Sequence, residues 1–276
     1  MELDHVAVNA KTGLTDLERV FRGFGFDLSP RGFHSLGSMN HVAVLSGSYL
    51  ELVGVPKANP DVRPEISSGH TGIDGLVFRT DDAHRTQAEL QAAGFKPGEV
   101  QEFSRPVAAD GSIAQARFRT VRLPPGLFGA GRIYFCEHLT PELIWKDGTL
   151  GHPNGSRRIS EVVVVSANPV EAAWRYATLA QTEPEFAEGG RLVPFQGFAV
   201  RVLSLESYAA IYRGNALSAG GEPEFFGAMV IQTTAGRGAI MSIEQDWKRS
   251  WSRDGVLRLS SEHRRILIEF DHARGQ

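Results

Sequence analysis

The stretch Leu3-Asp4-His5-Val6-Ala7-Val8 decides the fold, because three later stretches of the chain, at residues 73–78, 159–164 and 225–230, share its pattern. Each is short, apolar and rich in β-branched or aromatic residues, which is typical of a buried strand. The third position departs from this composition, and its residues in chain order are His5, Gly75, Glu161 and Gly227. A pattern that recurs along a chain indicates a repeated structural unit.

A helix is expected after each of these strands. After the first strand, apolar residues recur at the spacing of one helix face: Leu14, Leu17, Val20, Phe21 and Phe24. Asp81 or Asp82 can cap a helix after the second strand, and Asn168-Pro169 can begin one after the third. A weaker apolar spacing follows the fourth strand: Ile240, Ile243 and Trp247.

Further strands are predicted between each helix and the next repeat, and three of the four units end in a strand that carries a glutamate: Glu51, Glu137 and Glu269. A carboxylate in an apolar strand is costly to bury without a partner. Its recurrence therefore indicates a shared architectural role or an inherited site. The order of strand, helix and several strands, joined by short hairpin links, predicts an α+β fold of four βαβββ modules with mostly antiparallel pairing.

Composition excludes several classes of protein. The chain has 276 residues and a formal net charge of −3. It therefore lacks the excess of basic residues that would predict nucleic acid as a partner. No apolar run approaches the roughly 20 residues that a membrane-spanning helix needs, and the N-terminus lacks the pattern of a signal peptide. The single cysteine, Cys136, excludes an intramolecular disulfide and a cysteine-cluster metal site. We expect a cytoplasmic protein.

Four segments resemble the vicinal oxygen chelate superfamily, and in particular its glyoxalase-like domain proteins: residues 3–6, residues 40–52, residues 134–143, and His152-Pro153-Asn154-Gly155. The resemblance implies that modules pair, and that each pair curves an eight-stranded sheet around a cleft. It predicts a domain of residues 1–150 with the candidate site and a second domain of residues 151–276. We place the boundary near residues 146–156 and expect the second domain to be degenerate.

The resemblance also implies a divalent metal, Fe, Mn, Zn or Ni, in the cleft. Its ligand positions carry over to His5, Glu51, Gly75 and Glu137, of which Gly75 has no ligand atom. One imidazole and two carboxylates from His5, Glu51 and Glu137 form a plausible facial set for such metals. The alternative is that His5 and Glu51 form a buried ion pair without a metal.

Other residues are candidates for catalysis or substrate binding. Glu51 and Glu137 can serve as ligand or proton shuttle, and His138 enters the cleft if its strand shifts by one residue or bulges. His34, Asn40 and His152 are candidate substrate contacts. Each has a structural alternative: His34 is an exposed loop residue, Asn40 caps a loop, and His152 belongs to a linker turn.

Two functions follow from this reasoning. The first is an enzyme of the glyoxalase-like kind, which acts on a small molecule with vicinal oxygens by lyase, isomerase or dioxygenase chemistry. The second is a protein of the bleomycin-resistance type, which sequesters a ligand without turnover, and the glycine at position 75 favours it. A homodimer is allowed, but four modules in one chain do not require one to complete a cleft. The second pair, with Glu161, Gly227 and Glu269 at the ligand positions, looks more structural.

Overall fold

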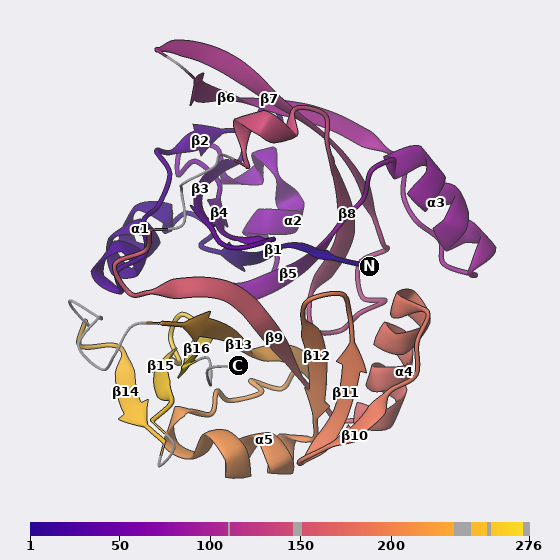
Figure 1. The fold of residues 1–276 in the computed structure, drawn as a ribbon, viewed down its shortest axis with the longest axis vertical. Helices are drawn as coiled ribbons and strands as arrows, with labels where there is room; N and C mark the ends of the chain where they lie inside the picture. The colour runs from indigo at the N-terminus through magenta and orange to yellow at the C-terminus, as the bar shows by residue number, and fades with distance from the viewer. Residues whose placement is uncertain (110, 146–150, 235–243, 253–254, 273–276) are drawn as a thin grey trace.

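The computed structural model describes residues 1–109, 111–145, 151–234, 244–252 and 255–272, and these form two eight-stranded mixed sheets (Figure 1). The first sheet contains β1 (Leu3–Asn9), β2 (Gly32–Phe33), β3 (Met39–Val44), β4 (Tyr49–Gly54), β5 (Gly72–Arg79), β6 (Gln101–Ala109), β7 (Ser112–Arg122) and β8 (Arg132–His138). The second contains β9 (Ser156–Ser166), β10 (Glu185–Ala187), β11 (Gly190–Pro194), β12 (Ala199–Leu203), β13 (Glu224–Thr233), β14 (Lys248–Trp251), β15 (Leu257–Ser261) and β16 (Ile266–His272). The helices are α1 (Leu14–Gly23), α2 (Pro64–Ser67), α3 (Ala83–Ala92), α4 (Pro169–Ala180) and α5 (Leu205–Tyr212), with 3-10 turns η1 (Pro60–Val62), η2 (Pro141–Leu143) and η3 (Arg213–Asn215).

The strand order confirms the predicted α+β fold of paired βαβββ modules. It is β2-β3-β4-β1-β5-β8-β7-β6 in the first sheet, and the second sheet repeats it from β9 to β16. In each sheet the first strands of two modules pair antiparallel at the centre, as β1 with β5 and β9 with β13. Each of these strands also pairs in parallel with the last strand of its own module: β1 with β4, β5 with β8, β9 with β12, and β13 with β16.

The helices only partly follow the prediction. The helices α1, α3 and α4 begin where the apolar spacing and the caps predict them, and the Asp82 side chain accepts a hydrogen bond from the Arg85 N–H. The helix expected near Ile240 and Ile243 falls outside the described residues. Trp247 lies in the non-helical segment that precedes β14 and packs edge-on against Phe24, with ring centroids 4.7 Å apart.

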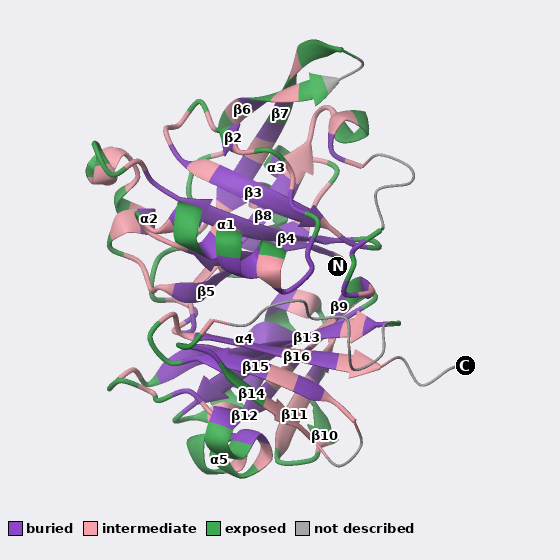
Figure 2. Cartoon of the chain, turned by 90° about the vertical axis from the view of Figure 1, so that its left-hand side faces the viewer, coloured by how far each residue is buried: buried purple, intermediate pink, exposed green. Residues whose placement is uncertain are grey.

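One hydrophobic core joins the two sheets. Figure 2 colours the central strands of both sheets as buried, and one cluster of buried apolar residues contains side chains from both halves of the chain. Phe78 of β5 stacks on Phe195 at 5.1 Å between centroids, and Phe128 packs on Tyr176 of α4 at 4.8 Å. Because aromatic side chains bury large apolar areas, these contacts fix the outer face of the first sheet against the second half of the chain.

The first sheet nearly closes into a barrel. Its two edge strands meet near β2 and β6, where the Ser35 N–H donates to the Ser104 carbonyl at 2.7 Å and the Ser104 N–H donates to Ser35 Oγ at 3.1 Å. Closure removes exposed strand edges and turns the inner face of the sheet into an enclosed space.

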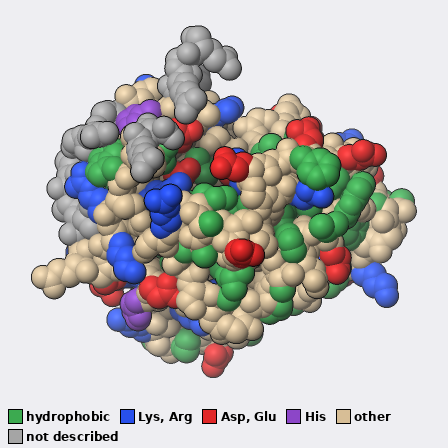
Figure 3. All heavy atoms as spheres, turned by 90° about the horizontal axis from the view of Figure 1, so that it is seen from below, with side chains coloured by type: hydrophobic (Ala, Val, Ile, Leu, Met, Phe, Trp, Pro, Cys, Tyr) green, Lys and Arg blue, Asp and Glu red, His purple; other side chains and the backbone are tan. Residues whose placement is uncertain are grey.

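Among the described residues, no helix is long and apolar enough to cross a membrane. The face seen in Figure 3 carries basic and acidic side chains interspersed with exposed apolar ones.

Gly72, at the start of β5, gives a test of how tightly the two halves pack. Its φ is +93°, and an added Cβ would lie 2.1 Å from the Arg265 carbonyl oxygen in the second half. Gly47 is a matched control, since its φ is +77° but no described atom lies within 4 Å of an added Cβ.

We expect Gly47→Ala to cost about 1 kcal/mol of unfolding free energy through its backbone conformation alone, and Gly72→Ala to cost at least twice as much. Urea unfolding followed by circular dichroism measures both. Equal losses in the two variants would contradict the tight packing at Gly72.

Candidate functional site

A β-bulge in β1 brings two neighbouring side chains to the inner face of the first sheet. The pairing of β1 with β5 shifts register between Leu3 and His5, which places the bulge at Asp4. Alternation would otherwise send Asp4 and His5 to opposite faces. Instead, His5 Nδ1 donates to Asp4 Oδ1 at 2.7 Å, and both residues are buried.

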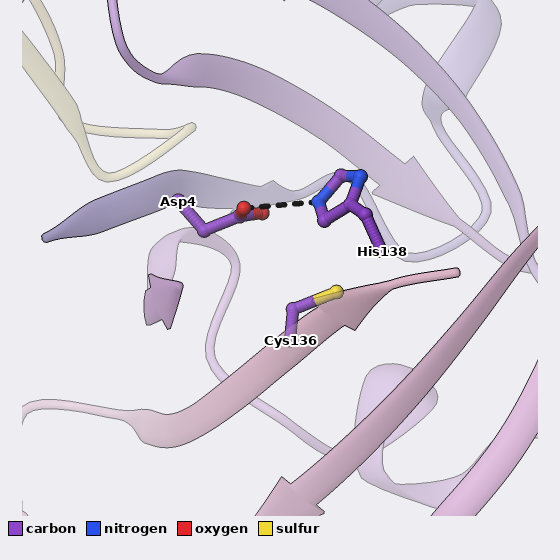
Figure 4. A group of neighbouring side chains, drawn as sticks. All are labelled: Asp4, Cys136 and His138. Atoms are coloured by element: carbon purple, nitrogen blue, oxygen red, sulfur yellow. Dashed lines mark hydrogen bonds and ion pairs between the residues drawn. The ribbon is translucent and has the colours of Figure 1, made fainter. Parts of the chain in front are cut away.

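The Asp4 carboxylate also holds a second imidazole. Its Oδ2 accepts a hydrogen bond at 2.9 Å from Nε2 of His138, at the end of β8 (Figure 4). His138 packs edge-on against Phe118 at 5.1 Å between centroids. Asp4 therefore links the first strand of one module to the last strand of the other.

His5 faces a small enclosed cavity of about 50 Å³ inside the first sheet. Across this cavity, His5 Nε2 lies 3.5 Å from Glu51 Oε2 and 3.2 Å from the Tyr134 hydroxyl. Asn40 Nδ2 donates to Glu51 Oε1 at 2.7 Å. The Tyr49 ring stacks on the His5 ring, with centroids 4.4 Å apart and planes at 14°.

The charges of His5 and Glu51 stabilise each other. Burial disfavours the imidazolium, but the interactions of His5 with Asp4 and Glu51 outweigh it and raise the pKa of His5 to about 9. Burial likewise opposes the Glu51 carboxylate, but its interactions with His5 and Asn40 lower the pKa of Glu51 to about 2. At neutral pH the pair is therefore a charged imidazolium beside a carboxylate.

Four arginines line the cavity, and two of them lack a carboxylate partner among the described residues. Arg132 pairs with Asp74, and Arg63 pairs with Glu65. Arg105 is buried with no ion pair, and burial lowers its pKa. Arg122 donates to the neutral amide of Gln101, and burial lowers its pKa as well. The cavity thus has an excess of positive charge.

Three buried polar atoms of cavity-lining residues have no hydrogen-bond partner in the described part of the chain: Asn40 Oδ1, Thr120 Oγ1 and Arg122 Nε. Buried polar groups are nearly always paired, so a cluster of unpaired ones indicates that a polar ligand completes the set. The Thr120 hydroxyl, Arg122 Nε and the Arg105 guanidinium can donate hydrogen bonds to an oxygen-rich anion, and Asn40 Oδ1 can accept one from a hydroxyl group of the same ligand.

The structure brings three of the predicted site residues together and places a fourth beside them. His5, Asn40 and Glu51 meet in the cavity. His34 lies at its border, where its Nδ1 is 2.8 Å from Ser38 Oγ and its ring packs edge-on against Phe103. Burial lowers the pKa of His34 to about 4, so its ring is neutral at physiological pH.

The structure does not bring Glu137 to this cavity. Along β8, Tyr134, Cys136 and His138 face inward, and alternation turns Glu137 outward. There Glu137 Oε2 accepts a hydrogen bond from the Ala83 N–H, in the first turn of α3, at 3.0 Å. The face assignment expected for Glu137 and His138 is therefore reversed, and Glu137 stabilises a helix N-terminus instead.

His152 also lies outside the cavity. Its Nδ1 accepts from the Asp27 N–H at 3.0 Å, and its Nε2 donates to the Val44 carbonyl at 2.8 Å. Both ring nitrogens are thus used by backbone groups. His152 therefore has the structural role that was the alternative to substrate contact: it belongs to a linker turn that contacts the first sheet.

Sequence reasoning missed Asp4, Tyr134, Arg105 and Arg122 as parts of the site. Arg105 had a local signal, because it alternates with Phe103 and Val107 in a strand pattern and is the one charged residue on that face. Its approach to Glu51 depends on the closure of the sheet, which no local pattern encodes.

The residues do not complete the metal site that the resemblance implies. His5 Nε2 and Glu51 Oε2 are two donors, Gly75 supplies none, and Glu137 is turned away. The surrounding arginines also oppose a cation. Facial metal sites use three protein ligands.

A second group, Asp4, Cys136 and His138, has ligand atoms within 4.8 Å of one another and is of a size to hold a metal ion (Figure 4). In this structure both oxygens of Asp4 already accept hydrogen bonds from imidazoles. Burial raises the pKa of the Cys136 thiol well above its usual range in the metal-free protein.

The equivalent face of the second sheet is filled by protein. Tyr208 of α5 donates to the Gly227 carbonyl at 2.8 Å, and α5 packs over the strands that would line a cleft. The two carboxylates at ligand positions are paired with arginines, Glu161 with Arg201 at 2.8 Å and Glu269 with Arg258 at 2.7 Å. The residues at these positions serve packing and ion pairing.

The shifted pKa of His5 makes a prediction about stability. Because the folded protein binds this proton more tightly than the unfolded chain, the stabilisation is complete below pH 6.5 and is lost as the pH rises through about 9. We expect the unfolding free energy to fall by about 3 kcal/mol over this range, and His5→Gln to flatten the decline. Urea titrations at a series of pH values measure it.

His152→Gln is the control for that measurement. His152 is buried, but burial lowers its pKa, so it is neutral over the whole range and its loss should leave the alkaline slope unchanged. Identical slopes for wild type and His5→Gln would contradict the assignment.

Comparisons with known proteins agree with this geometry. A family model for a glyoxalase-like domain matches residues 3–180. A hypothetical protein from Staphylococcus aureus has a similar structure, with a TM-score of 0.68 and 12% identity over 98% of this chain and 99% of that one. No curated protein sequence matches the chain.

Two further solved structures share the fold. One is a xylose isomerase-like TIM barrel/4-hydroxyphenylpyruvate dioxygenase fusion protein, with a TM-score of 0.58 and 11% identity over 98% of this chain and 48% of that one. The other is a mutant of 4-hydroxymandelate synthase from Streptomyces coelicolor, with a TM-score of 0.53 and 12% identity over 100% of this chain and 94% of that one. At these identities the likeness concerns the fold alone. The match of the family model to most of the chain shows that this protein belongs to the glyoxalase-like domain family within the vicinal oxygen chelate fold.

Proposed function

We propose that the protein is a small-molecule enzyme of the glyoxalase-like kind, which transfers a proton on an anionic substrate with vicinal oxygens, such as a 2-oxo or 2-hydroxy acid. The observation that carries the proposal is the unpaired, buried Arg105 guanidinium in the same small cavity as the His5–Glu51 pair. In this proposal the site belongs to the domain of residues 1–150.

Arg105 binds the substrate anion. A guanidinium with no carboxylate partner in a buried cavity offers planar donors to a carboxylate or to two neighbouring oxygens. The Thr120 hydroxyl can donate a further hydrogen bond to a substrate oxygen, and Asn40 Oδ1 can accept one from a substrate hydroxyl group. These contacts hold the carbonyl or hydroxyl carbon near His5 and Glu51.

His5 serves as the electrophilic group. Its bond to Asp4 fixes the ring, so that the charged imidazolium points its Nε2–H into the cavity. A substrate carbonyl oxygen that accepts this hydrogen bond is polarised, and negative charge that develops on it is stabilised by His5 and Arg105.

Glu51 serves as the base. In the free protein its pKa is low because His5 and Asn40 contact it. When the substrate oxygen takes over the hydrogen bond from His5 Nε2, the carboxylate loses part of that stabilisation and its proton affinity rises. Glu51 then takes the proton from the carbon next to the carbonyl, and the electron pair of that bond forms an enediolate or enolate. In a substrate with a hydroxyl group on that carbon, return of the proton to the former carbonyl carbon, together with transfer of the hydroxyl proton to the other oxygen, isomerises the substrate.

This chemistry fits the lyase and isomerase classes better than the dioxygenase class. Dioxygenase chemistry needs a redox metal, and the donors around His5 do not complete a site for one. No step of the proposed reaction is routed through a metal.

Proton transfer is tested by hydrogen–deuterium exchange at carbon. Wild-type protein in heavy water should exchange the carbon-bound protons next to the carbonyl in members of a panel of 2-oxo acids, followed by nuclear magnetic resonance. We expect Glu51→Gln to slow the exchange by about a hundredfold or more, because it removes the base. Arg105→Met should raise the KM strongly, because it removes the anion contact.

Arg117→Met is the control for Arg105→Met. Arg117 is an exposed arginine of β7 that pairs with Glu102, so its loss should leave exchange unchanged. If wild type binds the acids tightly and exchanges no proton in any of them, the enzyme proposal fails, and the sequestering function takes its place.

A further inference from the structure

An apolar groove of about 500 Å³ adjoins the polar cavity. Its walls come from residues 27–32, which include Asp27 and Arg31, and from β3, β6, the tip of β7 and η2. Its apolar side chains include Val44, Val107, Ile113, Leu143 and Ile144. Ile113 is 79% exposed, on the β6–β7 hairpin that extends from the sheet in Figure 1. A concave apolar surface of this size beside a polar site is typical of a ligand pocket.

The groove and the cavity adjoin and share part of their lining. Arg105 and Val42 line both of them. Along the inner face of β3 the side chains change from Asn40 in the cavity to Val44 in the groove. Along β6, Phe103 lines the cavity, Arg105 lies at the junction and Val107 lines the groove. On both β3 and β6, the side chains that line the two spaces therefore change from polar to apolar in the direction from the cavity to the groove.

Gly32 lies at the junction of the groove and the cavity, close to Asn40 and Arg105. An added Cβ at this position would lie 2.4 Å from Asn40 Oδ1 and 3.0 Å from Arg105 Nη1. The backbone of β2 thus passes directly against the two polar groups that separate the compartments. Because Gly32 has no side chain, Arg105 can reach the junction.

The two volumes indicate how a ligand is divided between the compartments. At about 50 Å³, the cavity holds only a small polar group, whereas sites for drug-sized ligands measure roughly 300–1,000 Å³. A substrate larger than a few atoms must extend through the junction. The adjoining space is the groove, and its apolar side chains favour binding of an apolar group.

We propose that the substrate is amphiphilic: its anionic, oxygen-bearing head binds at Arg105 in the cavity, and an apolar tail lies in the groove. This inference rests on the proposed function for the identity of the head group, but it concerns a separate set of residues. Arg105 acts as the junction residue that fixes which end of the molecule reaches His5.

The test is a chain-length series. Short, medium and long straight-chain 2-hydroxy acids are titrated into the whole protein by calorimetry. For wild type we expect Kd to fall with each added methylene that enters the groove, by up to about fourfold per methylene. Val107→Ser and Leu143→Ser should flatten this dependence while leaving the Kd of the shortest acid nearly unchanged. Arg105→Met and Arg105→Lys should weaken all lengths by a similar factor.

Val170→Ser is the matched control, since Val170 is an exposed apolar residue of α4, away from the groove, and this variant should keep the wild-type dependence on length. A wild-type Kd that does not change with chain length, or groove variants with an unchanged length dependence, would overturn the inference. Binding that depends on chain length, without proton exchange, would contradict the proposed function but would still support the amphiphilic ligand. Proton exchange in short acids, with a Kd that does not depend on chain length, would contradict the amphiphilic substrate but not the proposed function.

Discussion

The carboxylate of Asp4 is wholly buried, and the inner face of the first sheet is organised around the two imidazoles that contact it. Taking an unpaired carboxylate out of water costs several kcal/mol, so this position depends on the hydrogen bonds from His5 and His138 and on the Arg79 guanidinium, whose Nε lies 3.5 Å from Oδ2. The bulge in β1 is what allows the contact, since it turns Asp4 and His5 to the same side. Through His138, the same carboxylate ties β1 to the end of β8. The orientation of His5 toward Glu51 is thus a consequence of how Asp4 is satisfied.

The charge of the cavity follows from that arrangement. Because Asp4 and Glu51 stabilise the His5 imidazolium, the Glu51 carboxylate is already compensated and does not neutralise the arginines around it. Arg105 and Arg122 therefore contribute positive charge that no described carboxylate balances. A cation entering this space would meet repulsion, and an anion would meet preorganised donors. A complete set of metal ligands would have produced the opposite preference.

How much of this could be predicted from the sequence depends on the range of the interaction involved. The repeated strands and the glutamate in β4 are local patterns, and they led to His5 and Glu51. Glu137 shows the limit of such reasoning, because a shift of one residue in a strand exchanges its two faces. The bulge at Asp4 leaves no mark in the sequence. Arg105 comes near Glu51 only because β6 closes on β2 through Ser35 and Ser104, and that closure is a property of the whole sheet.

The second half of the chain shows what the same module becomes without a cavity. Its inner face is covered by α5, and its ligand-position carboxylates form ion pairs with arginines, so its inner face contributes stability rather than a site. Its outer face packs against the outer side of β5 through Phe78 and Phe195, directly behind the central strands of the first sheet. Rigid support of this kind is what a site needs when small displacements of its groups matter. The buried charges of His5, Glu51 and Arg105 demand such support, because a relaxed sheet would admit water and weaken every interaction among them.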